Sequence, residues 1–281
     1  MTVLDTETAQ SSADAVNVVR QSRREGRGGI RAIVAAIIGV GLFLGLWELA
    51  VWVFAIEPFK LPAPSDVLRN IADDPGFYVR HGRTTVWEAF LGFMLALFVA
   101  LAAATVMAHS RLVEQAVLPL AVLIQVTPII AYAPAVVIWL GFGLKPIVFI
   151  TSLVCLVPFL VNAVTGFRSI DPATYELMRS VDASRREIFF RLRVPHALPY
   201  LFSAARISVG LALIGAVLGE FFAGVTGGLG YAIKVAQNRG GDLLYQLWGS
   251  IFVLAAIGAT ATLLIGALER VVLRWHSSQA S

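Results

Sequence analysis

The sequence predicts an all-α membrane protein with six transmembrane helices. Hydrophobic residues make up 58% of its 281 residues and charged residues only 14%, whereas soluble domains carry about 25% charged residues. The apolar residues are gathered into long runs, and the charged residues lie in the short segments between them. The single cysteine, Cys155, lies inside an apolar run and excludes a disulfide framework within the chain.

Each apolar run is long enough to cross a bilayer, which takes about 20 mostly apolar residues in a helix. The predicted spans are Ile30–Ile56, Thr85–Ala108, Ala116–Leu140, Pro146–Phe167, Leu198–Ala223 and Leu243–Leu268.

Prolines interrupt two of these spans. The third contains Pro119, Pro128 and Pro134, and the fourth contains Pro158. Because proline removes a backbone hydrogen bond, we expect both helices to be kinked or broken. The glycine-rich segment 224–241, between the fifth and sixth spans, is expected to bend near the outer surface.

The ends of the chain are expected to be polar tails. The first apolar run begins near residue 30 and exceeds the length of a signal peptide, so we expect it to remain as a membrane helix. The expected domains are a disordered cytoplasmic tail over 1–29, a transmembrane domain over 30–272 and a cytoplasmic tail over 273–281.

The distribution of basic residues predicts the orientation. With the N-terminus inside, the inner segments carry about twice as many Lys and Arg residues as the outer segments, which favours both termini in the cytoplasm. The net charge of +4 also invites a nucleic-acid interpretation. Since the basic residues only flank apolar runs, we expect a lipid bilayer as the partner and no nucleic acid.

The longest inner loop, residues 168–199, is predicted to hold two short amphipathic helices. Asp171 and Pro172 are typical of an N-cap and a first helical position. Ser184 and Glu187 form a capping box that starts the second helix, and Pro195 and Pro199 are expected to end it. Such a pair of helices either rests on lipid headgroups or inserts into a groove of another protein.

The same loop resembles the EAA loop of binding-protein-dependent ABC transporter permeases. That loop reads Glu-Ala-Ala, three residues, Gly, nine residues and Ile-x-Leu-Pro, and the spacing fits throughout; the family glycine is replaced by Asp182, which must strain or cap there. The matching segments are Glu176-Leu177-Met178, Asp182 and Leu192-Arg193-Val194-Pro195.

Other segments resemble the nitrate/sulfonate/taurine-type permeases, so that the likeness covers residues 40–275. These segments are Leu61-Pro62-Ala63-Pro64-Ser65, Gln125 to Lys145, Gly215 to Phe221 and Gly228-Leu229-Gly230-Tyr231.

The resemblance implies a type I ABC importer permease (MetI-like) architecture with two short cytoplasmic coupling helices. It further implies a cytoplasmic ABC ATPase dimer, an extracytoplasmic solute-binding protein and a second permease copy, as a homodimer, as partners. The implied solute is nitrate, a sulfonate such as taurine, or a pyrimidine-like vitamin precursor. ATP binding would close the ATPase dimer, move the coupling helices and open the pathway outward by alternating access.

The residues that match the loop are the candidates for coupling to the ATPase. Glu176 is alternatively a helix-dipole partner, and Arg179 alternatively faces lipid headgroups. The full set is Glu176, Leu177, Met178, Arg179, Asp182, Ala183, Leu192 and Pro195.

Polar and small residues within the spans are the candidates for lining the pathway. Glu220 either lines or gates a pore or simply reaches water at the outer end, whereas Glu48 is expected to be paired structurally. Small residues at a spacing of four, such as Gly215 and Gly219, permit either close helix packing or a pathway at the dimer axis. The full set is Gln125, Thr127, Ser208, Ala212 and Glu220.

No motif supports chemistry in this chain, so it is not expected to be an enzyme. The sequence has no Walker A loop, no catalytic cluster and no metal-ligand spacing, so we expect no cofactor, and ATP hydrolysis belongs to a partner subunit. The alternatives are an ion-coupled secondary transporter, which would show paired broken helices in matching halves, a membrane-embedded enzyme and a structural membrane adaptor.

Overall fold

The computed structural model describes residues 34–241 and 243–273. The chain divides between Asp66 and Val67 into two compact units. The expected tail 1–29 lies outside the described residues, as does the tail 273–281 except for Leu273, so the domain boundaries stay a prediction.

The first unit holds the helix Val34–Val53, which is apolar enough to span a membrane. Its acid, Glu48, is paired as expected, because the carboxylate accepts hydrogen bonds from the backbone N–H of Ser65 (3.1 Å) and from the Ser65 hydroxyl (2.7 Å). The helix is therefore tied to Ser65 in the first turn of α2 (Pro64–Asp73).

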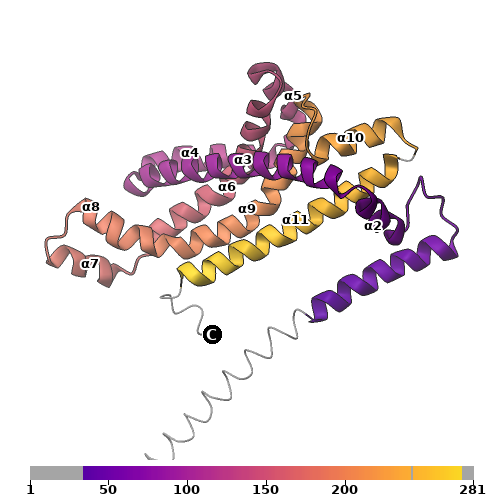
Figure 1. The fold of residues 1–281 in the computed structure, drawn as a ribbon. Coiled ribbons are helices and arrows are strands. Elements are labelled where there is room, and N and C mark those ends of the chain that lie inside the picture. Colours follow the sequence, from indigo (N-terminus) through magenta and orange to yellow (C-terminus); the bar gives the residue numbers. More distant parts are fainter. Residues whose placement is uncertain (1–33, 242, 274–281) are drawn as a thin grey trace, which may run out of the picture. The chain divides into compact units, whose positions relative to one another are not determined.

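The second unit is a bundle of helices (Figure 1). In chain order they are α3 (Pro75–His109), α4 (Arg111–Val126), α5 (Ile129–Leu140), α6 (Leu144–Arg168), α7 (Pro172–Ser180), α8 (Arg185–Ile188), the π-helix Phe189–Arg193, α9 (Val194–Phe222), α10 (Leu229–Arg239) and α11 (Leu243–Val272).

The third predicted span is broken, as the prolines predict. α4 ends at Val126 and α5 begins at Ile129, and the two helices meet at 103° across Thr127 and Pro128. The fourth span differs, because α6 runs unbroken through Pro158. The described part of the chain thus has five helices able to cross a membrane, or six if the bent pair counts as one span.

α6 packs between α3 and α9 through residues that lack a side chain at the point of contact. A Cβ atom on Gly215 would lie 2.7 Å from Thr151 Cα, and one on Gly219 would lie 2.9 Å from Ile147 Cα. At Gly92 of α3 there is likewise no room for a Cβ atom, because it would collide with the Thr151 side chain. Small residues allow such close helix contact within a bilayer, so the Gly215–Gly219 pair packs helices inside the protomer.

A buried acid ties α10 to the bundle. Glu220 is 1% exposed, and its carboxylate accepts hydrogen bonds from the Thr85 hydroxyl (2.7 Å) and the Tyr231 N–H (3.0 Å). The Leu229 N–H in turn donates to the Thr85 hydroxyl (2.8 Å). Gly228 has a φ of 94°, and a Cβ there would collide with the Glu220 carboxylate. The glycine-rich segment thus holds a helix, α10, besides the expected bend.

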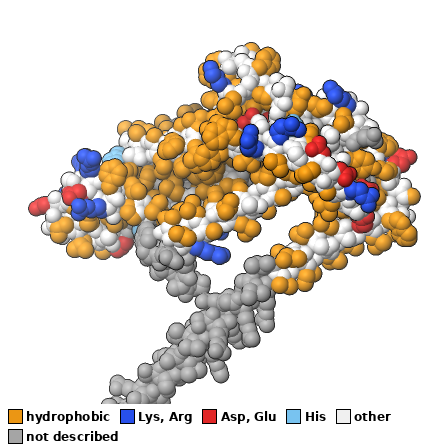
Figure 2. All heavy atoms as spheres, viewed as in Figure 1, with side chains coloured by type: hydrophobic (Ala, Val, Ile, Leu, Met, Phe, Trp, Pro, Cys, Tyr) orange, Lys and Arg blue, Asp and Glu red, His pale blue; other side chains and the backbone are white. Residues whose placement is uncertain are grey.

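The predicted loops meet at two ends of this unit. At one end the Gly143 N–H donates to the Ala223 carbonyl (3.0 Å), which joins two predicted outer loops. α7 and α8 lie at the other end, beyond the C-terminal end of α6 (Figure 1). Figure 2 shows mostly hydrophobic side chains over the intervening helices and charged side chains around α7 and α8, as expected for a bundle that crosses a bilayer.

Candidate functional site

The segment from Pro172 to Ile188, the α7–α8 hairpin, carries most of the predicted coupling residues. α7 begins at Pro172 with Asp171 as its N-cap residue, as predicted. The Asp171 carboxylate accepts a hydrogen bond from the Thr174 hydroxyl (3.4 Å) and none from a backbone N–H. Proline at the first position fixes the entry of the chain into the helix.

Asp182 makes the turn between the two helices. Its φ is 53°, in the left-handed region that glycine prefers. The Asp182 N–H donates to the Arg179 carbonyl (3.1 Å), and the Ala183 N–H donates to the Met178 carbonyl (3.1 Å). Aspartate is among the few residues that adopt this conformation at modest cost, so the bend is formed without the family glycine.

Replacing Asp182 with glycine is expected to stabilise this turn by about 0.5–1 kcal/mol, because the left-handed strain is removed. Amide hydrogen exchange at Ala183 and Ser184 measures the effect and should slow in the variant. Asp182→Ala is the matched control and should speed the same exchange, since alanine tolerates this φ poorly. Faster exchange in the glycine variant would contradict the assignment of strain.

The second helix starts with the predicted capping box. The Ser184 hydroxyl accepts from the Glu187 N–H (3.2 Å), and the Glu187 carboxylate accepts from the Ser184 N–H (3.0 Å). The prediction that Pro195 and Pro199 end this helix is wrong, because one continuous helical segment runs from Arg185 to Phe222. Pro195 lies in the first turn of α9, after the wider π-helical turn, where a missing N–H is tolerated.

The hairpin exposes apolar as well as charged side chains. Glu176, Arg179 and Asp182 are exposed, and Leu177 is 65% exposed. The remaining predicted coupling residues are partly buried: Met178, Ala183, Leu192 and Pro195. An apolar side chain among charges on a projecting hairpin is typical of a docking surface.

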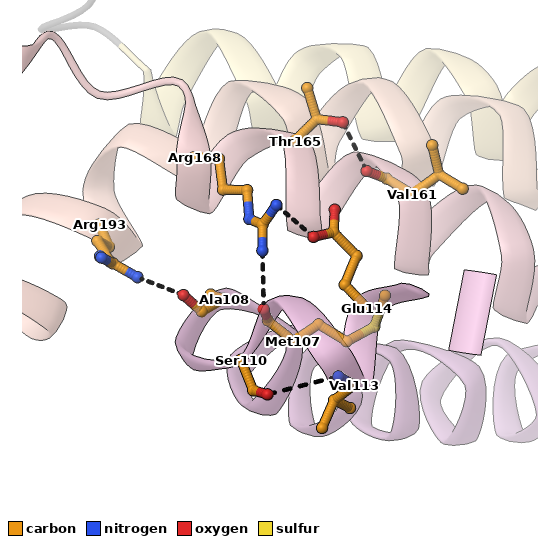
Figure 3. Close-up of polar contacts among 9 residues, drawn as sticks. All are labelled: Met107, Ala108, Ser110, Val113, Glu114, Val161, Thr165, Arg168 and Arg193. Atoms are coloured by element: carbon orange, nitrogen blue, oxygen red, sulfur yellow. Dashed lines mark hydrogen bonds and ion pairs between the residues drawn. The ribbon is translucent and has the colours of Figure 1, made fainter. Parts of the chain in front are cut away.

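Both ends of the hairpin are attached to the corner between α3 and α4 (Figure 3). Arg168, the last residue of α6, forms an ion pair with Glu114 and donates to the Met107 carbonyl (3.0 Å). Arg193, the last residue of the π-helix, donates to the Ala108 carbonyl (3.2 Å). We call these contacts the arginine clamp.

The clamp uses two of the last carbonyls of α3, those of Met107 and Ala108. The last carbonyls of a helix lack partners within it, and they lie at the negative end of the helix dipole. Arginine is suited to this position because its guanidinium donates several hydrogen bonds and stays charged. The clamp thus fixes the base of the hairpin to α3 and α4 by charge-assisted bonds.

Aromatic contacts fill the space beside the clamp. The Phe189 ring lies 5.4 Å from the Phe167 ring and 5.9 Å from the His109 ring, between centroids. Phe189 is the first residue of the π-helix, Phe167 lies near the end of α6 and His109 is the last residue of α3. This packing therefore joins the ends of α3 and α6 to the π-helix, as the clamp does.

The sequence did not predict the clamp, because Arg168 and Arg193 were counted only as basic residues of the inner segments that set the orientation. A signal was present in Glu114, an acid in the first turn of α4 just after a basic inner segment. Its partner lies 54 positions along the chain, which spacing alone does not reveal.

The predicted pathway residues fall into two groups. Gln125 and Thr127 are exposed at the break between α4 and α5, and the Thr127 hydroxyl donates to the Leu123 carbonyl (2.8 Å). A cavity of about 220 Å³ beside them is also lined by Tyr132 and Leu211. Their role in a pathway stays a prediction.

The other group is packed inside the protomer. Ser208 is 0% exposed, Ala212 is 4% exposed and Glu220 is held by Thr85 and Tyr231. In this structure the small residues of α9 face α6 and Glu220 faces α3 and α10, and a role of these three residues in a pathway stays a prediction.

Comparison with known proteins gives the family. Residues 92–277 match the model described as "Binding-protein-dependent transport system inner membrane component". The chain is 32% identical to the formylaminopyrimidine transport permease protein of Halalkalibacterium halodurans, over 85% of this chain and 94% of that relative. It is 35% identical to the riboflavin transport system permease protein of Chloroflexus aurantiacus, over 84% of this chain and 88% of the relative.

A more distant relative is the taurine transport system permease protein of Escherichia coli, which is 28% identical over 88% of this chain and 91% of its own length. The apolar helices, the broken third span and the EAA-type hairpin agree with these matches. The chain therefore belongs to the family of binding-protein-dependent transport system inner membrane components, the permeases of ABC importers.

Proposed function

We propose that this chain forms the solute pathway of an ABC importer and that its α7–α8 hairpin docks on a cytoplasmic ATPase dimer. The observation that carries the proposal is an exposed hairpin whose base is clamped to the transmembrane bundle by Arg168 and Arg193. A hairpin that only rested on lipid would need no such attachment to two carbonyls of another helix.

The proposed orientation places both termini in the cytoplasm. The hairpin end of the bundle carries Arg111, Arg168, Arg179, Arg185 and Arg193, in agreement with the excess of basic residues expected inside. The solute-binding protein then meets the opposite end, where Glu220 holds α10 against α3 and α9.

The proposed mechanism is a two-state rotation of helices. ATP binding closes the ATPase dimer, and the hairpin moves with it. The arginine clamp passes this motion to the α3–α4 corner, and the close glycine contacts of α6 with α3 and α9 keep these three helices moving as one body. ATP thus shifts an equilibrium between two arrangements by contacting them differently.

A second copy of the chain is proposed to complete the pathway. The break between α4 and α5 exposes Gln125 and Thr127, and the Gln125 amide would be costly against lipid. Facing the same residues of a second copy, they would line a shared polar route, so we keep these two as the pathway candidates.

The proposed solute is a small nitrogen heterocycle of the vitamin-precursor kind, with nitrate and sulfonates such as taurine as the other options. Two relatives above 30% identity are named for formylaminopyrimidine and riboflavin, whereas the taurine relative is 28% identical. Uptake into proteoliposomes that hold the permease, the ATPase and the binding protein tests the class. Uptake that proceeds without ATP would favour the ion-coupled alternative.

Replacing Glu176 with lysine is expected to reduce ATPase co-purification about tenfold or more, because a charge reversal at the centre of a docking surface removes a contact and adds repulsion. Asp73→Lys makes the same charge change at an exposed position at the end of α2 and should leave co-purification unchanged. An unchanged amount of ATPase with the Glu176 variant, at equal membrane insertion, would refute the docking role.

A further inference from the structure

We propose that a cleft at the base of the α7–α8 hairpin binds the phosphate group of an anionic phospholipid. The cleft has a volume of about 460 Å³ and lies between the α3–α4 corner, the end of α6 and the start of α7. Its polar lining is His109, Ser110, Arg111, Arg168, Tyr175 and Arg193.

The lining carries a surplus of positive charge. Three arginines face the cleft, and Glu114, the acid paired with Arg168, is not among its lining residues. The Arg111 side chain forms no hydrogen bond or ion pair with any residue that the structure describes. A guanidinium has five N–H donors, so Arg168 and Arg193 keep free donors beyond those of the clamp.

The start of α4 adds further donors. The Ser110 hydroxyl accepts from the Val113 N–H (3.4 Å), and the N–H groups of the two preceding helical residues have no partner within the helix. α4 is 16 residues long, so the positive end of its dipole lies at this opening. Converging guanidinium and backbone donors match the oxygens of a phosphate.

The surroundings favour a lipid as the source of the phosphate. Leu112, next to Arg111, is 79% exposed, and Leu120 and Leu123, farther along the same side of α4, are 58% and 64% exposed. Acyl chains would cover this apolar face while the headgroup enters the cleft. The cytoplasmic location of the site rests on the proposed orientation, whereas binding of an anionic lipid does not depend on it.

The test is native mass spectrometry of the full-length permease during titration with phosphatidylglycerol. Arg111→Gln removes the unpaired arginine and leaves the clamp intact, so we expect about fivefold weaker binding of the tightest lipid, since each basic residue at an anionic surface contributes about 1 kcal/mol. Arg239→Gln, at the exposed end of α10, is the matched control and should bind as the unaltered chain does.

The remaining arms identify the source of the phosphate. Phosphatidylcholine should bind equally to both variants, because its headgroup has no net charge. Displacement of phosphatidylglycerol by millimolar inorganic phosphate would assign the cleft to a free anion and overturn the lipid assignment. Equal phosphatidylglycerol affinity of Arg111→Gln and Arg239→Gln would overturn the site. ATPase co-purification, measured on the same samples, reports separately on the docking of the hairpin.

Discussion

Replacing Gly215 with alanine is expected to lower the stability of the bundle by about 2 kcal/mol or more, because overpacking a tight contact forces backbone shifts. The added Cβ would lie 2.7 Å from Thr151 Cα, a backbone atom in the middle of α6 that has no freedom to move aside. Residues larger than alanine at position 215 should prevent α9 from packing on α6 altogether. The loss of monodisperse protein on heating in detergent measures the effect.

Gly210, on the same helix, provides the control. A Cβ there would meet no atom within 4 Å, so Gly210→Ala should be neutral or slightly stabilising, by about 0.5–1 kcal/mol, since alanine has the higher helix propensity. Equal melting temperatures for the two alanine variants would show that α6 and α9 leave room for a Cβ atom at position 215 and would contradict the close contact.

Removing both arginines of the clamp is expected to uncouple ATP hydrolysis from transport. In the double variant Arg168→Ala and Arg193→Ala, the hairpin keeps its exposed surface and should still retain the ATPase. The charge-assisted bonds to the end of α3 are lost, each worth about 1.5–3 kcal/mol, and transport per ATP hydrolysed should fall about tenfold or more, since coupling energies are of this size. Uptake and hydrolysis measured in the same proteoliposomes give the ratio.

A neighbouring arginine separates the clamp from charge in general. Arg191 lies in the same π-helix as Arg193, but its side chain is 74% exposed, and its guanidinium nitrogen lies as far as 4.0 Å from the Glu187 carboxylate oxygen. Such surface ion pairs contribute about 0–1 kcal/mol to stability. Arg191→Ala should therefore leave the ratio of transport to hydrolysis unchanged. A fall in that ratio equal to that of the double variant would assign the effect to surface charge and remove the clamp from the mechanism.

Much of the fold could be predicted because bilayers demand long apolar helices. The break at Pro128 and the capping box of Ser184 and Glu187 follow from local chemistry that acts within a few residues. The turn at Asp182 can form because aspartate tolerates the left-handed region that glycine prefers.

What escaped prediction depends on contacts between distant segments. The direction in which Ser208 and Ala212 face is fixed by the packing of α9 on α6, which a spacing of four residues leaves open. α10 was hidden because Gly228 was interpreted as part of a bend, whereas its missing side chain makes room for the Glu220 carboxylate. The clamp joins Arg168 to the α3–α4 corner across a sequence separation that no local rule spans.

The π-helical turn Phe189–Arg193 has a consequence for any engineering of this chain. Such a turn holds one residue more than an α-helical turn would, and each residue advances an α-helix by about 100°. A helical wheel that treats Arg185 to Phe222 as one uninterrupted α-helix would therefore misplace the directions of the α8 side chains by about 100° relative to those of α9. Cysteine pairs designed to cross-link hairpin residues such as Glu187 to a partner must be placed from the three-dimensional register and not from sequence periodicity.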